Sequence, residues 1–155
     1  MLRGLYVKNL ALIDETGVEF KKGLNILTGE TGAGKSLLLG SVNLALGKKA
    51  DKDIIRKDEE YALVELLFYV ENKTILQKLK EMDVIFESEG EVLISRKLLQ
   101  GRSISKVNGE TVSAAELKQI TGLLLDIHGQ HEHQSLLDKA KHLEIVDEFA
   151  GKTLE

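Results

Sequence analysis

The sequence predicts a mixed domain of α-helices and β-strands, of the α/β or α+β class, in which helices pack against a mixed sheet. Three observations lead to this class. Segments rich in β-forming residues recur along the chain, a glycine-rich loop stands between a strand and an apolar helix, and further segments have helical periodicity. With 155 residues, 43% of them hydrophobic and 30% charged, the chain is the size of one globular domain.

Composition excludes several classes of protein. No apolar run approaches the roughly 18 to 20 residues of a membrane span, and the charged N-terminal stretch does not resemble a signal peptide. The chain has no cysteine, so a disulfide framework and a thiolate metal site are excluded, and we expect a cytoplasmic protein. The net charge of −4 means that any contact with DNA must come from a local basic patch or from other parts of the protein.

The first third of the chain predicts strand, loop and helix in that order. Residues 2–13 alternate partly and indicate a strand. Residues 17–29 predict two short strands joined by a Lys-Lys-Gly turn, the second at Leu24–Thr28. After the glycine loop, residues 35–47 are apolar on nearly all sides, which predicts a helix buried between layers and ended by Gly47.

The rest of the chain alternates between strands and helices. Tyr61–Val70 is rich in β-formers and predicts a strand, and residues 72–82 have apolar positions at helical spacing. Residues 91–112 predict a hairpin that turns at residues 100–102, with a further turn at Asn108–Gly109. We expect an antiparallel β-rich edge formed by residues 1–28 and 61–70, together with this hairpin.

The C-terminal part predicts two helices and a strand. Ser113 to Glu116 has the spacing of a capping box, which predicts a short helix ending near Gly122. Residues 123–130 then indicate a buried strand that runs into a loop, and residues 136–151 indicate a closing helix.

The most specific motif is the stretch GETGAGKS. It satisfies the phosphate-loop pattern G-x-x-x-x-G-K-[ST] and consists of Gly29, Glu30, Thr31, Gly32, Ala33, Gly34, Lys35 and Ser36. Glycines at these positions allow backbone N–H groups to surround phosphate oxygens, while the lysine reaches the β- and γ-phosphates and the serine binds Mg²⁺. The motif therefore predicts binding of ATP with Mg²⁺.

A phosphate-loop fold also needs an acidic residue at the end of a second strand to hold Mg²⁺. Asp147 and Glu148 follow an apolar pair, but residues 136–149 fit the helical period better than the strand period. Asp126 is a second candidate, although its apolar run continues through Ile127.

Three histidines stand within six residues at His128, His131 and His133. They suggest a metal site, but a strand-to-loop junction does not direct all three side chains to one point. The alternative interpretation is that Gln130, at the end of a strand, reaches the nucleotide site.

Basic residues form two clusters that predict either a contact with nucleotide or DNA, or a solvated surface. The first cluster follows the phosphate-loop helix, and the second surrounds the hairpin; acidic neighbours dilute both. Their members are Lys48, Lys49, Lys52, Arg56 and Lys57, and Arg96, Lys97, Arg102 and Lys106.

Five stretches in one order, LYVKNLALID, GETGAGKS, LLLGSVNLALG, SKVNG and LLDIHGQHEHQSLL, resemble the N-terminal segment of the RecN family of bacterial DNA-repair ATPases, relatives of the SMC proteins. The stretch IHGQHEHQ is the most distinctive of the five. The resemblance covers essentially the whole chain and implies the N-terminal half of an ABC-type ATPase head, a single partial domain over residues 1–155.

The resemblance also implies the roles of individual residues. Residues 29–36, with Leu37 beside them, would bind ATP, and Lys35 and Gln130 would act in catalysis. Ser36 and Gln130 would contact Mg²⁺, and Arg56 would lie near the nucleotide.

In that family a long coiled coil follows this half, and a C-terminal lobe then supplies the signature motif and the Walker B carboxylates; neither of these two motifs is recognisable here. The implied partners are this C-terminal lobe, a second head and DNA, with no membrane. Localisation would be cytoplasmic, at the nucleoid in the whole protein.

Two alternatives remain open. One is a self-contained small kinase or NTPase that uses Asp147 or Asp126 for Mg²⁺. The other is a non-enzymatic interaction fragment. For the half-head interpretation we expect ATP binding with negligible hydrolysis, and an exposed apolar face where the second lobe is missing.

Overall fold

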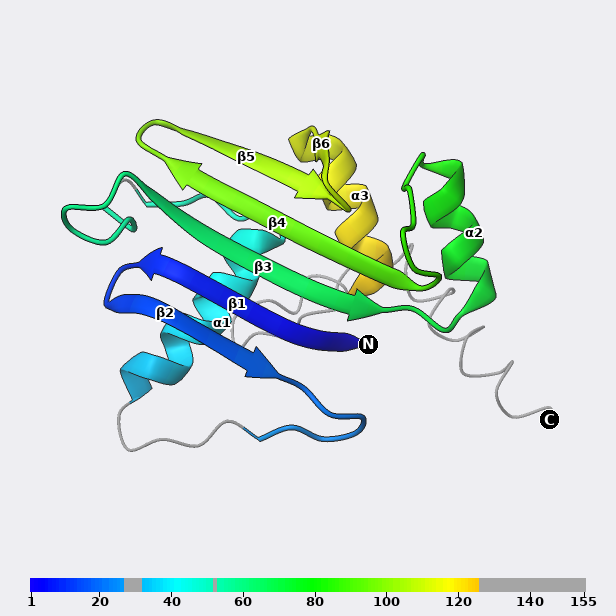
Figure 1. Ribbon diagram of the computed structural model, residues 1–155, viewed down its shortest axis with the longest axis horizontal. Coiled ribbons are helices and arrows are strands. Elements are labelled where there is room, and N and C mark those ends of the chain that lie inside the picture. The colour runs from blue at the N-terminus through cyan, green and yellow to red at the C-terminus, as the bar shows by residue number, and fades with distance from the viewer. Residues whose placement is uncertain (27–31, 52, 126–155) are drawn as a thin grey trace, which may run out of the picture. The chain divides into compact units, whose positions relative to one another are not determined.

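The computed structural model describes residues 1–26, 32–51 and 53–125. Six strands form one sheet in the order β2-β1-β3-β4-β5-β6, and every neighbouring pair is antiparallel (Figure 1). The strands are β1 Leu2–Leu10, β2 Ile13–Glu19, β3 Tyr61–Tyr69, β4 Glu91–Leu99, β5 Arg102–Val107 and β6 Glu110–Val112. The helices are α1 Gly32–Ala45, α2 Lys73–Glu81 and α3 Ala114–Leu124.

Alternate residues of the central strands form the core, because successive side chains of a strand point to opposite faces. In β3 the buried positions are Ala62, Val64, Leu66 and Phe68. The register aligns Leu66 with Leu5 of β1 and with Ile94 of β4. One face of the sheet is therefore apolar across three strands.

Helices α1 and α3 lie behind the sheet in the view of Figure 1. Helix α1 contributes Val42, Leu44 and Ala45 to the core, and α3 contributes Leu117 and Ile120. The two helices meet where α1 ends, since a Cβ built on Gly47 would lie 3.4 Å from Leu117 Cδ2. The fold is a layer of helices on a sheet, and the expected mixture of helices and strands is confirmed. The expected mixed sheet is corrected for the described residues, because every pair of neighbouring strands there is antiparallel.

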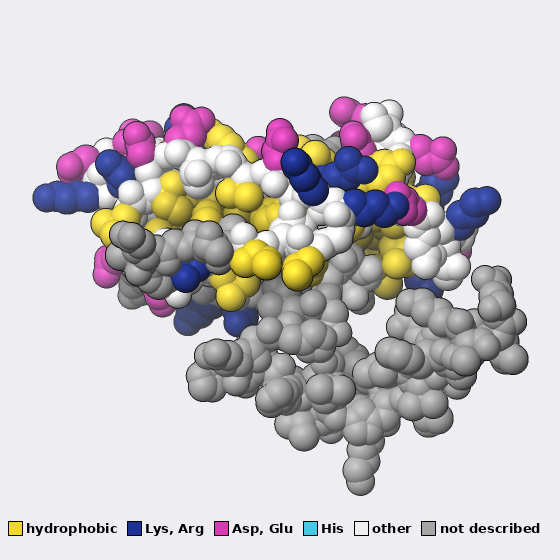
Figure 2. All heavy atoms as spheres, turned by 90° about the horizontal axis from the view of Figure 1, so that it is seen from below, with side chains coloured by type: hydrophobic (Ala, Val, Ile, Leu, Met, Phe, Trp, Pro, Cys, Tyr) yellow, Lys and Arg dark blue, Asp and Glu magenta, His cyan; other side chains and the backbone are white. Residues whose placement is uncertain are grey.

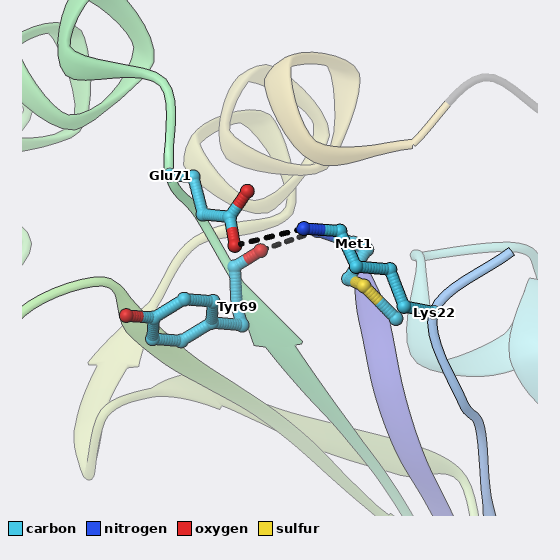
Figure 3. Close-up of polar contacts among 4 residues, drawn as sticks. All are labelled: Met1, Lys22, Tyr69 and Glu71. Carbon is cyan, nitrogen blue, oxygen red and sulfur yellow. Dashed lines mark hydrogen bonds and ion pairs between the residues drawn. The ribbon is translucent and has the colours of Figure 1, made fainter.

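Hydrogen bonds connect Met1, which precedes β1, to Tyr69, the last residue of β3. The Met1 amino group donates a hydrogen bond to the Tyr69 carbonyl oxygen (Figure 3). The Tyr69 amide donates in turn to the Met1 carbonyl oxygen at 2.8 Å. Nearby, Lys22 Nζ lies 3.7 Å from Glu71 Oε1. Both side chains of that ion pair are well exposed, so the pair contributes little to stability.

The predicted antiparallel edge, the hairpin and the capping box at Ser113 are confirmed. Strands β4 and β5 pair from Leu99↔Arg102 onward. Ser113 caps α3 in a capping box: its Oγ accepts from the Glu116 amide at 3.2 Å, and its own amide donates to Glu116 Oε2 at 2.7 Å. Asn72 caps α2 in a similar way, because its Oδ1 accepts from two backbone amides of the first turn.

The strand predicted at Leu24–Thr28 is wrong for its described part, Leu24–Ile26, which is irregular. A strand needs a neighbour to pair its backbone groups, and no described strand pairs with these residues. Hydrogen bonds of a local turn take the place of hydrogen bonds to a neighbouring strand. Asn25 Oδ1 accepts from the Lys21 amide at 2.9 Å, and Asn25 Nδ2 donates to the Lys21 and Gly23 carbonyl oxygens at 2.7 and 3.1 Å.

The single strand predicted over residues 2–13 is in fact a hairpin. Strand β1 ends at Leu10, and β2 begins at Ile13 after a tight turn. Ala11 in this turn has a φ of 50°, which is uncommon for a residue other than glycine, asparagine or aspartate. The sequence offers no Asn-Gly or Gly-rich signal here, so the turn was not recognisable.

Two predictions about helices are corrected. Leu123 and Leu124 belong to α3 rather than to a strand, because Gly122 does not take the positive φ with which a glycine ends a helix. Helix α1 is not buried throughout: Leu39 is 51% exposed, and the fully buried positions all lie in the C-terminal half, from Ser41 to Ala45.

Candidate nucleotide-binding site

The predicted phosphate loop leads into the first turn of α1, which begins at Gly32. Lys35 and Ser36 are exposed, and Leu37 is half-buried. The first turn contains no acidic residue, so the positive end of the helix dipole is not offset there. The first backbone N–H groups of a helix have no partner within the helix, and together with the Lys35 ammonium they suit a bound anion such as phosphate.

Gly34 provides open space at this helix end. A Cβ built on Gly34 would meet nothing within 4 Å, and its φ is not positive. Neither crowding by described neighbours nor backbone strain requires glycine here. A phosphate group close to the backbone would require it, so the residues present fit a triphosphate with Mg²⁺ at Ser36. Gly29, Glu30 and Thr31 lie outside the described residues.

The far end of α1 is held by Arg96, which extends from β4 across the buried face of the sheet. Arg96 Nη1 donates to the carbonyl oxygens of Leu44 and Lys48, at 2.5 Å each, and Nη2 donates to Ser103 Oγ at 3.1 Å. Only 9% of Arg96 is exposed, and this burial lowers its pKa. A cation is favourable here because the C-terminal end of a helix is negative.

The prediction that Arg96 belongs to a basic surface cluster is therefore wrong. Its position in the sequence, four residues before the hairpin turn, suggests a surface residue. Its register shows otherwise: Arg96 pairs with Val64 of β3 and shares the core face with it. A period of two along β4, with Val92, Ile94 and Leu98 as the other buried members, could have identified the position.

Arg56 lies at the end of the β1–β2 hairpin. Its Nη1 donates to the Leu12 carbonyl oxygen at 3.0 Å, and its amide donates to the Asn9 carbonyl oxygen at 2.9 Å. Asn9 Nδ2 in turn donates to Glu59 Oε2 at 3.0 Å. These bonds fix the segment after α1 against β1, and a role of Arg56 toward nucleotide stays a prediction.

Several predicted site residues lie outside the described residues: Gln130, the three histidines His128, His131 and His133, and the acidic candidates Asp126 and Asp147. Within residues 1–26, 32–51 and 53–125, no group of three or more His, Asp or Glu side chains could hold a metal ion. The same residues include no helix long and apolar enough to cross a bilayer.

A cleft of about 570 Å³ lies between residues 49–55 and the β4–β5 hairpin. Its walls carry both signs of charge, from Lys49 and Arg102 and from Asp51 and Asp53, and Arg96 also lines it. Of the other hairpin cations, Lys97 Nζ lies 4.3 Å from the centre of the Tyr61 ring, a cation–π contact on the opposite face. No local pattern in the sequence indicates this cleft, because its walls come from segments about 50 residues apart in the chain.

The chain matches the family model of the AAA domain over residues 5–152. It is 42% identical over 156 residues to the DNA repair protein RecN of Halalkalibacterium halodurans and 40% identical to that of Bacillus subtilis. Each alignment covers 100% of this chain but only 28% and 27% of the relative. The chain thus spans about a quarter of the length of the curated relatives that it matches.

Solved structures of ATPase heads share the fold. One chain, from work on ATP-driven dimerization and DNA-stimulated activation of SMC ATPases, superposes with a TM-score of 0.66 at 20% identity, covering 96% of this chain and 98% of that one. The Smc head of Pyrococcus furiosus, bound to a domain of ScpA, gives 0.62 at 23% identity, covering 79% and 32%. The fold is that of a phosphate-loop, ABC-type ATPase head, and the chain belongs to the AAA domain family as a counterpart of the N-terminal segment of RecN.

Proposed function

We propose that this chain is the ATP-binding N-terminal lobe of a RecN-like protein that acts in the repair of DNA double-strand breaks by recombination. The observation that carries the proposal is the exposed Lys35–Ser36 pair in the first turns of α1, directly after the glycine loop. The relatives aligned along the whole chain are named DNA repair proteins, which supports the biological role.

Different residues of the site would bind different parts of Mg-ATP. Backbone N–H groups of the glycine loop would surround the phosphates, and Lys35 would neutralise charge on the β- and γ-phosphates. Ser36 would hold Mg²⁺ with its hydroxyl group, and Leu37 would contribute its amide near the helix start. Gln130 would complete the site by contacting Mg²⁺ and the attacking water, with Arg56 near the nucleotide.

Binding alone does not give hydrolysis. Phosphoryl transfer also needs a positioned water and groups that stabilise the charge spreading over the γ-phosphate. We infer that these groups come from the C-terminal lobe of the same protein and from a second head docked across the nucleotide. The whole protein would then hydrolyse ATP on head engagement and tether DNA ends, in the cytoplasm and at the nucleoid.

The surface of the lobe supports a missing partner. Hydrophobic side chains lie among charged ones on the face shown in Figure 2. Leu12, Leu24 and Ile26 are 85%, 89% and 73% exposed. Side chains of this size prefer burial by roughly 1.5 to 3 kcal/mol each, so a docked lobe or a second copy would be favoured.

The test is calorimetric titration of this chain with Mg-ATP, together with steady-state hydrolysis. We expect binding without turnover. Lys35→Ala should abolish the binding, whereas Lys73→Ala, which removes an exposed lysine from the first turn of α2, should leave it unchanged. Absence of binding by the wild-type chain would refute an ATP-binding lobe.

Turnover that depends on Lys35 would instead show that this chain carries its own catalytic carboxylate. The self-contained kinase or NTPase, with Asp126 or Asp147 for Mg²⁺, would then replace the half-head. Adding the C-terminal lobe of the same protein provides the complementary experiment, since we expect it to raise hydrolysis above the background of either part.

A further inference from the structure

We propose that Arg96 is a positioning residue of the nucleotide site, acting on Lys35 and Ser36 through the length of helix α1. The inference rests on the proposed ATP-binding function and extends it to a residue far from the loop. Lys35 and Leu44 are nine residues apart, which corresponds to about 14 Å along a helix.

The first step is where α1 is held. Its buried residues, Ser41, Val42, Leu44 and Ala45, lie in the C-terminal half. In the N-terminal half, Lys35 and Ser36 are exposed, Leu37 and Leu38 are half-buried and Leu39 is 51% exposed. Among the described residues, the C-terminal half of the helix is therefore packed more firmly than the half that follows the phosphate loop.

The second step is what holds the C-terminal end of the helix. The helix closes with a Schellman motif, in which the Gly47 amide donates to the Leu44 carbonyl oxygen at 3.1 Å and the Lys48 amide donates to the Asn43 carbonyl oxygen at 3.0 Å. Gly47 has a φ of 104°. Arg96 adds hydrogen bonds to the carbonyl oxygens of Leu44 and Lys48. It therefore binds both the last turn of α1 and the segment that follows the helix.

The third step is that the hydrogen bonds of Arg96 have a fixed geometry and also involve the β4–β5 hairpin. A guanidinium group is planar, and its donors have fixed directions, so two carbonyl oxygens and Ser103 Oγ together define one orientation. Ser103 belongs to β5 and Arg96 to β4. Arg96 therefore ties α1 to two neighbouring strands, and loss of the tie would allow the helix to shift along the sheet.

A shift of about 1 Å at a site that positions phosphate is enough to weaken function substantially. Removal of Arg96 should consequently reduce the affinity for Mg-ATP although Arg96 does not touch the nucleotide. Its buried Nε–H has no hydrogen-bond partner among the described residues, which suits a role in which geometry at the other two nitrogens matters more than full satisfaction of the group.

The experiment compares Arg96→Met, Arg96→Lys and Leu79→Ala in this chain. Leu79 is fully buried on α2, so its truncation lowers stability without touching α1. Two quantities are measured under conditions where each variant is folded: affinity for Mg-ATP, and hydrogen exchange of the amides of residues 34–40.

We expect Arg96→Met to weaken Mg-ATP binding roughly tenfold and to accelerate exchange at residues 34–40. Arg96→Lys should fall between it and the wild type, because an ammonium keeps the charge but cannot reach three acceptors in the same fixed geometry. Leu79→Ala should leave both quantities at the wild-type level despite its lower stability.

Wild-type affinity in Arg96→Met would overturn the inference while leaving the proposed function intact, and so would an equal loss of affinity in Leu79→Ala. If Arg96→Met does not fold, wild-type affinity in Arg96→Lys overturns it. If the wild-type chain binds no ATP, the proposed function fails, and exchange at residues 34–40 still decides whether Arg96 holds the helix.

Discussion

Gly90, at the entrance to β4, offers a prediction whose size follows from the coordinates. Its φ is 88°, and a Cβ at this position would lie 2.7 Å from the Val70 carbonyl oxygen and 3.3 Å from Tyr69 Cε2. Gly101, in the β4–β5 turn, has a φ of 79°, but a Cβ there would meet nothing within 4 Å. The two glycines share the backbone conformation and differ in crowding.

Replacing each glycine by alanine separates these two effects. The positive φ alone costs an alanine about 1 kcal/mol, and we expect this value for Gly101→Ala. In Gly90→Ala the contact with backbone adds about 1 to 3 kcal/mol, as overpacking does elsewhere. The neighbouring bond from the Val70 amide to the Gly90 carbonyl oxygen, 2.7 Å long, should also weaken.

Urea unfolding followed by circular dichroism measures both variants against the wild type, with the slope of the transition checked for constancy. Gly90→Ala should lose about 2 to 4 kcal/mol of unfolding free energy and Gly101→Ala about 1 kcal/mol. If the two losses agree within about 0.5 kcal/mol, the close approach of Gly90 to Val70 does not contribute, and the reasoning from crowding is refuted.

Three further predictions concern the caps, a tyrosine and the apolar surface. Ser113→Ala should lower the unfolding free energy by about 1 kcal/mol, because the Glu116 amide loses its acceptor; thermal unfolding would show no shift if the cap were unimportant. The hydrogen bond from the Tyr6 hydroxyl to Glu15 Oε1, 2.6 Å long, raises the pKa of Tyr6 to about 12. The stability that this bond contributes is present below the usual tyrosine pKa of about 10 and is lost as the pH rises through about 12. Glu15→Gln should return the absorbance titration of Tyr6, identified by difference from Tyr6→Phe, toward 10, and an unchanged titration would contradict the bond. Leu24→Ser should reduce concentration-dependent self-association in sedimentation velocity, and an unaltered profile would show that this side chain does not mediate it.

The sequence was most informative where local chemistry decides the structure. The strand predicted at Tyr61–Val70 and the capping box at Ser113 depend on residues close together in the chain, and both are found, as β3 and at the start of α3. The phosphate loop was recognisable because eight consecutive residues carry its chemistry.

The sequence was least informative where the structure of a segment depends on a partner that is distant in the chain. Leu24–Ile26 has the composition of a strand, yet no described strand pairs with it, and an Asn25-centred turn takes over. Arginine is usually found at the surface. Only the pairing of Arg96 with β3 and its hydrogen bond to α1 show that this arginine is buried. In the site, Lys35 and Ser36 are found at a helix start as predicted, whereas Gln130 lies outside the described residues.

The order of the sheet has a consequence for how the lobe folds. Strands β3 to β6 follow one another as a meander, so each pairing joins segments that are close in the chain. Strand β1 instead inserts between β2 and β3, and its pairing of Leu5 with Leu66 closes a loop of about 60 residues, which is entropically slower. The whole of α1 lies inside that loop. During synthesis from the N-terminus, α1 is therefore made before β3 and β4, and its contacts with these two strands can form only after they have emerged.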